Sequence, residues 1–328
     1  MAENNFKTPA LVFDTQSIIN NAKKYRGKNN FKTLYSVKLC PDSRAVNIIN
    51  RYVDGYDIAN YNEFKTIKHL DLSKKTISMC GPAFLKNDVI KILKKDVKKL
   101  ILVFDSHHQW LDCYNLCDGK KVFYMLRINE QTFNNNKKCR YGFFNKNLPI
   151  EKHFIGLHLH VTRNSNLRNE KTYLKFYSIA KSIKQTKFIN FGGGQHTYNW
   201  FKLKSKLKSQ KITHIIEPGQ PFFMHSVSAY GKIVNIKNQN THTVVIQNLC
   251  NTCHLTWSRN KKIKLENGTD NIKVYGPTCD TEDFIIEAMG DVKKLYVGQV
   301  LKFDDINPAS ASFNRSFNGQ PKAQIFFV

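Results

Sequence analysis

Eight short apolar runs between about residue 30 and residue 220 constrain the fold of this 328-residue chain most strongly. Polar, Lys-rich stretches of helix length separate the runs, so strands and helices should alternate. Continuous apolar runs are typical of parallel strands that are buried on both faces, and eight of them predict a (β/α)8 barrel. The runs are KTLYSVK, DGYDIAN, KTISMCG, KLILVFD, KVFYMLRIN, FIGLHLH, TKFINFGGG and THIIEPG.

The pattern changes after about residue 225. The segments SVSAYGKIVNIK, THTVVIQNL, NIKVYGP and QVLKFDDI have β character and are joined by turns, with little helix-length material between them. They predict a C-terminal antiparallel β domain, and the strand-like segment Lys7–Asp14 is expected to join it. We therefore predict a barrel over residues 26–225 and a β-sandwich or barrel-like domain over residues 1–25 and 226–328.

The chain is strongly basic. Its 51 Lys and Arg against 25 Asp and Glu give a formal net charge of +26, which on electrostatic grounds favours anionic partners. The lysines are scattered rather than clustered in sequence, which argues against a nucleic-acid groove. The N-terminus lacks the pattern of a secretory signal, and no apolar run approaches the roughly eighteen residues of a membrane span. We expect a cytoplasmic protein with neither a nucleic-acid nor a membrane partner.

Lys38 directly follows the apolar run KTLYSV. Barrel active sites lie at the C-terminal ends of the strands, and nearly every run of this chain ends in or beside a charged residue, a histidine or a glycine. Burial there would lower the pKa of the lysine and make its amine a nucleophile for an aldehyde cofactor. Taken alone, a lysine that ends a strand is more often structural or solvent-facing.

Three later segments strengthen this interpretation of Lys38. Gly192–Gly194 follow a strand, and consecutive glycines let backbone N–H groups approach a phosphate, the alternative being a flexible turn. Glu217 follows the next strand and could keep a pyridine nitrogen protonated; otherwise it is an exposed residue of a turn. His160 ends its run and could stack on a cofactor ring, although a lone histidine is more often a core residue.

The order of these motifs resembles the fold-type III decarboxylases, a family that includes ornithine, diaminopimelate and carboxynorspermidine decarboxylases. The likeness runs from about residue 7 to the C-terminus, and seven motifs in one order are far more specific than any one alone. The motifs are Tyr35-Ser36-Val37-Lys38, Gly55-Tyr56-Asp57-Ile58-Ala59, Gly156-Leu157-His158-Leu159-His160, Asn190-Phe191-Gly192-Gly193-Gly194, Glu217-Pro218-Gly219, Gly276-Pro277-Thr278-Cys279-Asp280 and Phe317-Asn318-Gly319.

The resemblance implies an alanine-racemase-like barrel that binds pyridoxal 5'-phosphate. Lys38 would be the Schiff-base lysine, His160 would lie over the cofactor ring, and Glu217 would pair with the ring nitrogen. The remaining cofactor contacts would come from Asp57, Gly192, Gly193 and Gly194.

The resemblance also implies a homodimer with shared active sites. Cys279 would reach into the neighbouring subunit's site and protonate the carbanion left after carbon dioxide departs. Asp280 or Asp283 would face a substrate amine. Two subunits would then build each active site.

Further motifs are most similar to the carboxynorspermidine and carboxyspermidine branch. They add Arg127, Asn248 and His254 to the expected substrate-binding residues. The implied function is decarboxylation of an amino acid or of a carboxylated polyamine. The motifs are Arg127-Ile128-Asn129, Cys139-Arg140-Tyr141-Gly142, Gln220 and Cys253-His254-Leu255.

Two positions depart from the family pattern. Ala309 stands where members usually carry a tyrosine that contacts the cofactor phosphate, and Asn248 stands where the polyamine branch usually has an acidic residue. A basic amino-acid decarboxylase of the ornithine or lysine type, a racemase on the same barrel and a catalytically silent regulatory homologue are therefore alternatives. A racemase would want a tyrosine base from the partner subunit, whereas Cys279-Asp280 follows the decarboxylase pattern.

His158 and His160 are two residues apart, so on a strand they would point to one face. Together they could bind a metal if a carboxylate met them. The cofactor role of His160 is the stronger interpretation, and we expect no metal site.

Overall fold

The computed structural model describes residues 6–27, 31–135, 138–144, 147–161, 165–193, 200–207 and 211–328. The chain forms two compact units, Ala22–Phe222 and Met1–Asn21 with Phe223–Val328, and each is described by itself. The domain boundaries at 25/26 and 225/226 stay a prediction, because compactness alone does not define a domain that folds independently.

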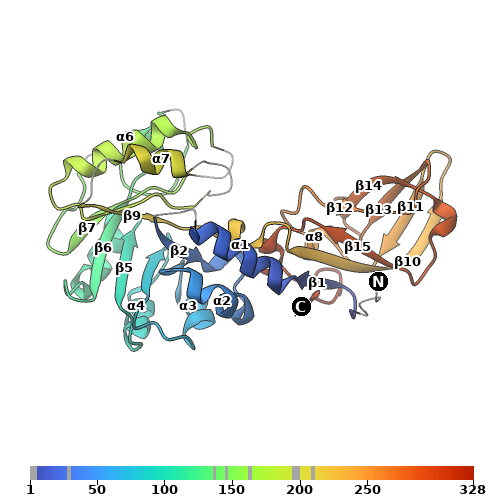
Figure 1. Ribbon diagram of the computed structural model, residues 1–328, viewed down its shortest axis with the longest axis horizontal. Coiled ribbons are helices and arrows are strands. Elements are labelled where there is room, and N and C mark those ends of the chain that lie inside the picture. The colour runs from blue at the N-terminus through green and yellow to red at the C-terminus, as the bar shows by residue number, and fades with distance from the viewer. Residues whose placement is uncertain are drawn as a thin grey trace. The chain divides into compact units, whose positions relative to one another are not determined.

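Eight parallel strands close into a barrel in the first unit (Figure 1). Each of the eight apolar runs forms one of these strands in chain order, and β2 pairs with β9 to close the ring. The predicted (β/α)8 barrel is therefore confirmed. The strands are β2 (Lys32–Ser36), β3 (Gly55–Ile58), β4 (Thr76–Cys80), β5 (Lys99–Phe104), β6 (Val122–Arg127), β7 (Phe154–His158), β8 (Phe188–Asn190) and β9 (Thr213–Ile216).

Helices connect most of the barrel strands. Several begin directly after a residue whose side chain accepts a hydrogen bond from the first turn, as Asp42, Asn60, Ser106 and Asn169 do. Among the described residues, no helix is long and apolar enough to cross a membrane. The helices are α1 (Thr15–Gly27), α2 (Ser43–Ile49), α3 (Tyr61–Ile67), α4 (Lys86–Leu93), α5 (His107–Cys113), α6 (Glu170–Ser182) and α7 (Trp200–Lys206).

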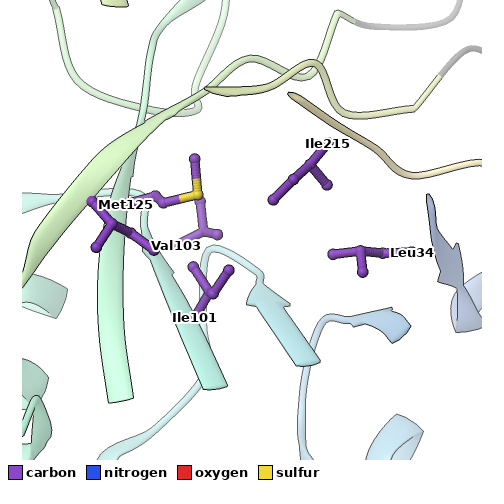
Figure 2. Packing of buried hydrophobic residues seen from close by; sticks show 6 residues of the cluster. Leu34, Ile101, Val103, Met125 and Ile215 are labelled. Atoms are coloured by element: carbon purple, nitrogen blue, oxygen red, sulfur yellow. The ribbon is translucent and has the colours of Figure 1, made fainter. Parts of the chain in front are cut away.

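The middle of the barrel is filled by aliphatic side chains and one methionine. Figure 2 shows side chains from β2, β5, β6 and β9 converging on one another. Because side chains alternate along a strand, a residue two positions before or after a member of this layer on the same strand also faces the barrel interior. The apolar layer consists of Leu34, Ile101, Val103, Met125, Ile155 and Ile215.

The second unit is built on an eight-stranded sheet, which β1 joins by pairing with β10. The predicted β domain with an N-terminal strand is therefore confirmed. Most pairings are antiparallel, but β1 pairs with β16, and β11 with β13, in parallel. The strands are β1 (Ala10–Phe13), β10 (Val227–Asn238), β11 (Thr243–Gln247), β12 (Lys262–Ile263), β13 (Asp270–Tyr275), β14 (Phe284–Gly290), β15 (Val300–Asp304) and β16 (Gln324–Phe327), and a short helix, α8, spans Asn251–His254.

Candidate active site at the C-terminal end of the barrel

A buried polar cluster lies next to the apolar layer, toward the C-terminal ends of the strands. Ser36 is two positions after Leu34, and Glu217 is two positions after Ile215, so strand alternation brings both toward the barrel interior. Every member of the cluster is at least nine-tenths buried. The members are Ser36, Asp57, Ser78, Arg127, His158, Asn190 and Glu217.

Glu217, which follows β9, is the centre of this cluster. One carboxylate oxygen accepts hydrogen bonds from Asn190 Nδ2 at 2.6 Å and Ser78 Oγ at 3.4 Å, and the other lies 3.3 Å from His158 Nε2. Burial alone would raise the pKa of Glu217, but the charges of His158 and Lys38 and the hydrogen bonds together lower it below its ordinary value. The site therefore holds an ionised carboxylate in a fixed orientation.

Lys38 lies in a single 3-10 turn, Val37–Leu39, directly after β2. Its Nζ is 3.9 Å from Asp57 Oδ2, and 52% of its side chain is solvent-exposed. Desolvation favours the neutral amine, but the negative charges of Asp57 and Glu217 outweigh it and raise the pKa of Lys38 above its ordinary value. The prediction that burial lowers this pKa is wrong, because the sequence pattern did not place two carboxylates beside the amine.

Asp57, in β3, lies beneath the lysine and is almost fully buried. Its Oδ2 accepts a hydrogen bond from Ser36 Oγ at 3.1 Å, whereas its Oδ1 has no hydrogen-bond partner among the described residues. Burial and the nearby charge of Glu217 raise the pKa of Asp57 to about 7, against the opposing influence of Lys38 and His158. Oδ1 is therefore a buried polar atom near the Lys38 amine whose hydrogen-bonding capacity is unused by the described residues.

The raised pKa of Asp57 predicts a pH-dependent stability of the ligand-free protein. Because the native state holds this proton between about pH 4 and pH 7 and the unfolded state does not, the contribution of Asp57 to the free energy of unfolding should fall as pH rises through that window. With about 1.4 kcal/mol per pKa unit, the fall is on the order of 3 kcal/mol. His160 and His214, whose pKa values are lowered, act in the opposite direction in this range, so the test is the difference between two proteins. From pH 5 to pH 8, urea denaturation should show a fall that is about 3 kcal/mol larger in the wild type than in Asp57→Asn; equal pH dependence in both would contradict the assignment.

His160 follows β7 and faces the glycine-rich turn after β8. Its Nδ1 accepts a hydrogen bond from the Gly193 N–H at 3.3 Å. Burial, together with the charges of Lys38 and Arg127, lowers the pKa of His160 well below its ordinary value, so the ring is neutral. A neutral, flat ring at this position is suited to packing against another ring.

The glycines of this turn are required by close packing. Gly192 has φ +64°, and a Cβ there would lie 2.6 Å from the Leu159 carbonyl oxygen. A Cβ on Gly193 would lie 2.9 Å from His160 Cε1. The Gly192 N–H donates to Asn190 Oδ1, so the predicted phosphate contacts of these two glycines stay predictions. Gly194 lies outside the described residues.

Arg127 ends β6 on the same side of the barrel. Its guanidinium lies 3.3 Å from Asp105 and 4.3 Å from the centre of the Tyr141 ring. The ion pair is buried, and the aromatic ring covers the cation. Arg127 is therefore held in place beside the cluster, and its expected role in substrate binding stays a prediction.

His158, His160 and Glu217 also meet the condition set above for a metal site. Their potential ligand atoms all lie within 4.8 Å of one another. Binding a metal here would compete with the hydrogen bond between His158 and Glu217 and with the one between Gly193 and His160. His158 and Glu217 already bond to each other, and His160 accepts a hydrogen bond from the Gly193 N–H.

Cys279, Asp280 and Asp283 lie in the loop between β13 and β14 of the second unit. Asp283 is buried, and its two oxygens accept hydrogen bonds from the Asn251 N–H and the Thr278 hydroxyl, both at 2.6 Å. Asp280 is partly exposed and accepts one from the Glu282 N–H. Asp283 thus shapes the loop, whereas the Asp280 carboxylate remains accessible to a ligand.

Cys279 is exposed at the tip of this loop. Its backbone N–H lies 3.4 Å from Oδ1 of Asn318, which adopts φ +50°. Two of the motifs recognised in the sequence, the one around Cys279 and the one around Asn318, are therefore neighbours within one unit. This contact leaves the thiol of Cys279 exposed.

Three further residues singled out from the sequence have mainly structural contacts. His254 is fully buried and bonds to the Cys250 N–H and the Pro321 carbonyl, each at 2.9 Å. Asn248 binds the Lys232 N–H and the Thr8 hydroxyl. Ala309 is buried in a 3-10 turn, Pro308–Ala311, and offers no polar side chain.

The barrel brings together the residues expected to hold the cofactor. Lys38, Asp57, His160, Gly192, Gly193 and Glu217 all lie at its C-terminal end, whereas Asn248, His254, Cys279, Asp280 and Asp283 belong to the other unit. Ser78 and Asn190, which hold Glu217, were missed. Strand alternation after the apolar layer could have identified them.

A closed parallel barrel and a second unit whose sheet takes the N-terminal strand together have the fold of the fold-type III decarboxylases. No family profile matches the chain. The structure is similar to carboxynorspermidine decarboxylase from Campylobacter jejuni, with a TM-score of 0.82 and 22% identity over 98% of this chain and 94% of that one.

Two other known proteins show the same likeness. Lysine/ornithine decarboxylase from Vibrio vulnificus superposes with a TM-score of 0.81 and 15% identity, covering 99% of this chain and 95% of that one. The curated protein Decarboxylase flvG from Aspergillus flavus is 18% identical over 359 residues, which cover 95% of this chain and 83% of that protein. The expected resemblance is thus confirmed at the level of the fold.

Proposed function

We propose that this protein is a pyridoxal-phosphate-dependent decarboxylase that acts on an amino acid or a carboxylated polyamine. The observation that carries the proposal is that an accessible amine, Lys38, and an ionised, fixed carboxylate, Glu217, both lie at the C-terminal end of one barrel. The names of the similar proteins, all decarboxylases, support the same activity.

The residues present fit the cofactor. An ionised Glu217 suits a protonated pyridine nitrogen, and a neutral His160 suits a ring face. The unsatisfied Oδ1 of Asp57 offers a further polar contact, and the close packing of Gly192 and Gly193 leaves backbone rather than side chains at the turn. Ala309 supplies no phosphate contact, and the Gly192 and Gly193 N–H groups donate to Asn190 and His160, so a phosphate bound by the backbone of this turn would have to displace those hydrogen bonds.

When bound, pyridoxal phosphate supplies an electron sink for the electron pair released at the α-carbon as carbon dioxide leaves. Lys38 would hold the cofactor covalently through its Nζ. Glu217 would keep a proton on the ring nitrogen, and His158 and Asn190 would keep Glu217 in position. Cys279 would deliver the proton that replaces the lost carboxyl group.

The accessible carboxylate of Asp280 supports a substrate that carries an amine. A carboxylate at the end of an exposed loop suits an amine, and the similar structures from C. jejuni and V. vulnificus were determined with norspermidine and putrescine. A basic amino acid of the ornithine or lysine type is the alternative, because Asn248 does not supply the acidic group usual in the polyamine branch.

The absorbance spectrum of the purified protein tests this proposal. Incubation with pyridoxal phosphate followed by dialysis should leave a visible band that is absent from Lys38→Ala. A silent homologue without cofactor would show no band in either protein. Decarboxylation that is unchanged after dialysis against EDTA would exclude a catalytic metal at His158, His160 and Glu217, whereas activity that required added metal would contradict the proposal.

We also propose that the enzyme is a homodimer with shared active sites, because in the resembled family Cys279 must cross to the partner. Mixing inactive Lys38→Ala with inactive Cys279→Ala should restore about a quarter of wild-type activity after statistical exchange, since half the dimers are mixed and each holds one intact site. Different affinity tags on the two variants verify the exchange. If each chain supplied its own Lys38 and Cys279, verified mixing would restore nothing.

A further inference from the structure

Lysines gather at the N-terminal end of the barrel, although they are scattered along the sequence. Seven of the eight barrel strands begin at a lysine or within two residues after one, and only β3 is preceded there by an acidic residue, Asp54. The fold therefore places a ring of positive charge at the end of the barrel opposite Lys38. The lysines of this ring are Lys32, Lys74, Lys75, Lys98, Lys99, Lys120, Lys121, Lys152, Lys187 and Lys211.

Two of these lysines face the interior of the barrel. Lys32 is two positions before Leu34, and Lys99 is two positions before Ile101. Both amines lie over the ring of Phe188, at 6.0 Å and 4.5 Å from its centre. Burial and the charge of Lys99 lower the pKa of Lys32 to about 8, although Asp54 acts in the opposite direction. The cations thus repel one another in a partly desolvated place.

A pocket of about 440 Å³ opens beside Lys32. Four cationic side chains and one carboxylate line it, and that carboxylate, Asp54, is already paired with Arg26 at 3.6 Å and bonded to the Thr33 N–H at 2.9 Å. In the described parts of the chain, Lys32, Lys74 and Lys98 make no ion pair. The pocket therefore combines three amines that form no salt bridge among the described residues with a volume that is typical of small-molecule sites.

We propose that this pocket binds the oligophosphate group of a small molecule. Several negative charges on one compact ligand would offset the repulsion between the lysines, which a single carboxylate would not. Phe31, the aromatic residue that lines the pocket, is buried, and Phe188 lies under Lys32 and Lys99. A single-strand binding groove instead exposes its aromatic rings for base stacking. The site is separate from the proposed cofactor site, because Lys32 begins β2 and Lys38 follows its end.

Calorimetric titration at fixed salt, with protein saturated with pyridoxal phosphate, tests the proposal. The probes are sodium tripolyphosphate, ATP without magnesium, and a single-stranded oligonucleotide. The double variant Lys32→Gln/Lys98→Gln removes two amines of the pocket. The control, Lys171→Gln/Lys181→Gln, removes the same charge from exposed positions on α6. Melting temperatures of all three proteins show whether each variant is folded.

Tripolyphosphate should bind the wild type and the control saturably and raise their melting temperatures. Its affinity for Lys32→Gln/Lys98→Gln should be at least about tenfold lower, as expected for lost charge-assisted contacts. If ATP binds the wild type more tightly than tripolyphosphate does, and if Lys32→Gln/Lys98→Gln loses this higher affinity for ATP, a nucleotide is the source of the phosphates. Equal affinities in both variants, no saturable binding, or binding of the oligonucleotide alone would overturn the proposal.

Discussion

Lys38→Ala should abolish decarboxylation while leaving the protein folded. The side chain is 52% exposed, so its removal costs little packing, but the proposed covalent attachment of the cofactor has no other amine beside Asp57 to replace it among the described residues. Removing one positive charge from two buried carboxylates should also raise the pKa of Asp57 further, because Lys38 opposes that rise. Carbon dioxide release measures the loss of decarboxylation, and circular dichroism of the same preparation shows whether the protein is folded.

A matched control is Lys171→Ala, which removes an exposed lysine from α6. It should keep wild-type activity. Lys38→Arg preserves the charge beside Asp57 but not the nucleophilic amine, so it should be as inactive as Lys38→Ala. Turnover in Lys38→Ala that matched the control would show that the cofactor is not held by this residue.

Glu217→Gln should lower the rate by about 10²- to 10³-fold, the range seen when one preorganised electrostatic contact is lost. The substitution keeps the shape of the side chain but removes the negative charge that would hold a proton on the cofactor ring. Because Lys38 is unchanged, the cofactor should remain bound. Steady-state kinetics and the visible absorbance of the purified variant separate these two outcomes.

The control for Glu217→Gln is Glu287→Gln, which changes an exposed residue of β14. It should leave the rate unchanged. Loss of the cofactor band in Glu217→Gln would mean that the residue serves binding rather than the electronic state of the ring. A wild-type rate would mean that Glu217 does not contact the ring nitrogen.

The barrel was predictable because its strands are buried on both faces. Such strands give continuous apolar runs, and a run that ends in Lys38 or Glu217 identifies the end where polar residues meet. In the second unit, β12, β14 and β16 were missed. β16 pairs in parallel with β1, more than three hundred residues earlier, and a local pattern carries no signal for such a partner.

The electrostatic state of the site could not be predicted in the same way. The pattern indicated that Lys38 would be buried, and burial alone lowers the pKa of an amine. The opposite shift arises from Asp57 and Glu217, which come from β3 and the end of β9 and meet only when the barrel closes. Similarly, nothing in the local sequence shows that Asp283 accepts bonds from Asn251 and Thr278.

The most direct test of the proposed activity is the release of carbon dioxide from a panel of substrates. The panel contains ornithine, lysine, diaminopimelate, arginine, carboxynorspermidine and carboxyspermidine, each incubated with the wild type and with Lys38→Ala in the presence of pyridoxal phosphate. We expect the wild type to release carbon dioxide and the matching amine in equal amounts from at least one of them, and Lys38→Ala to release none. Release from no member of the panel by a wild type that binds the cofactor, or equal release by both proteins, would contradict the account.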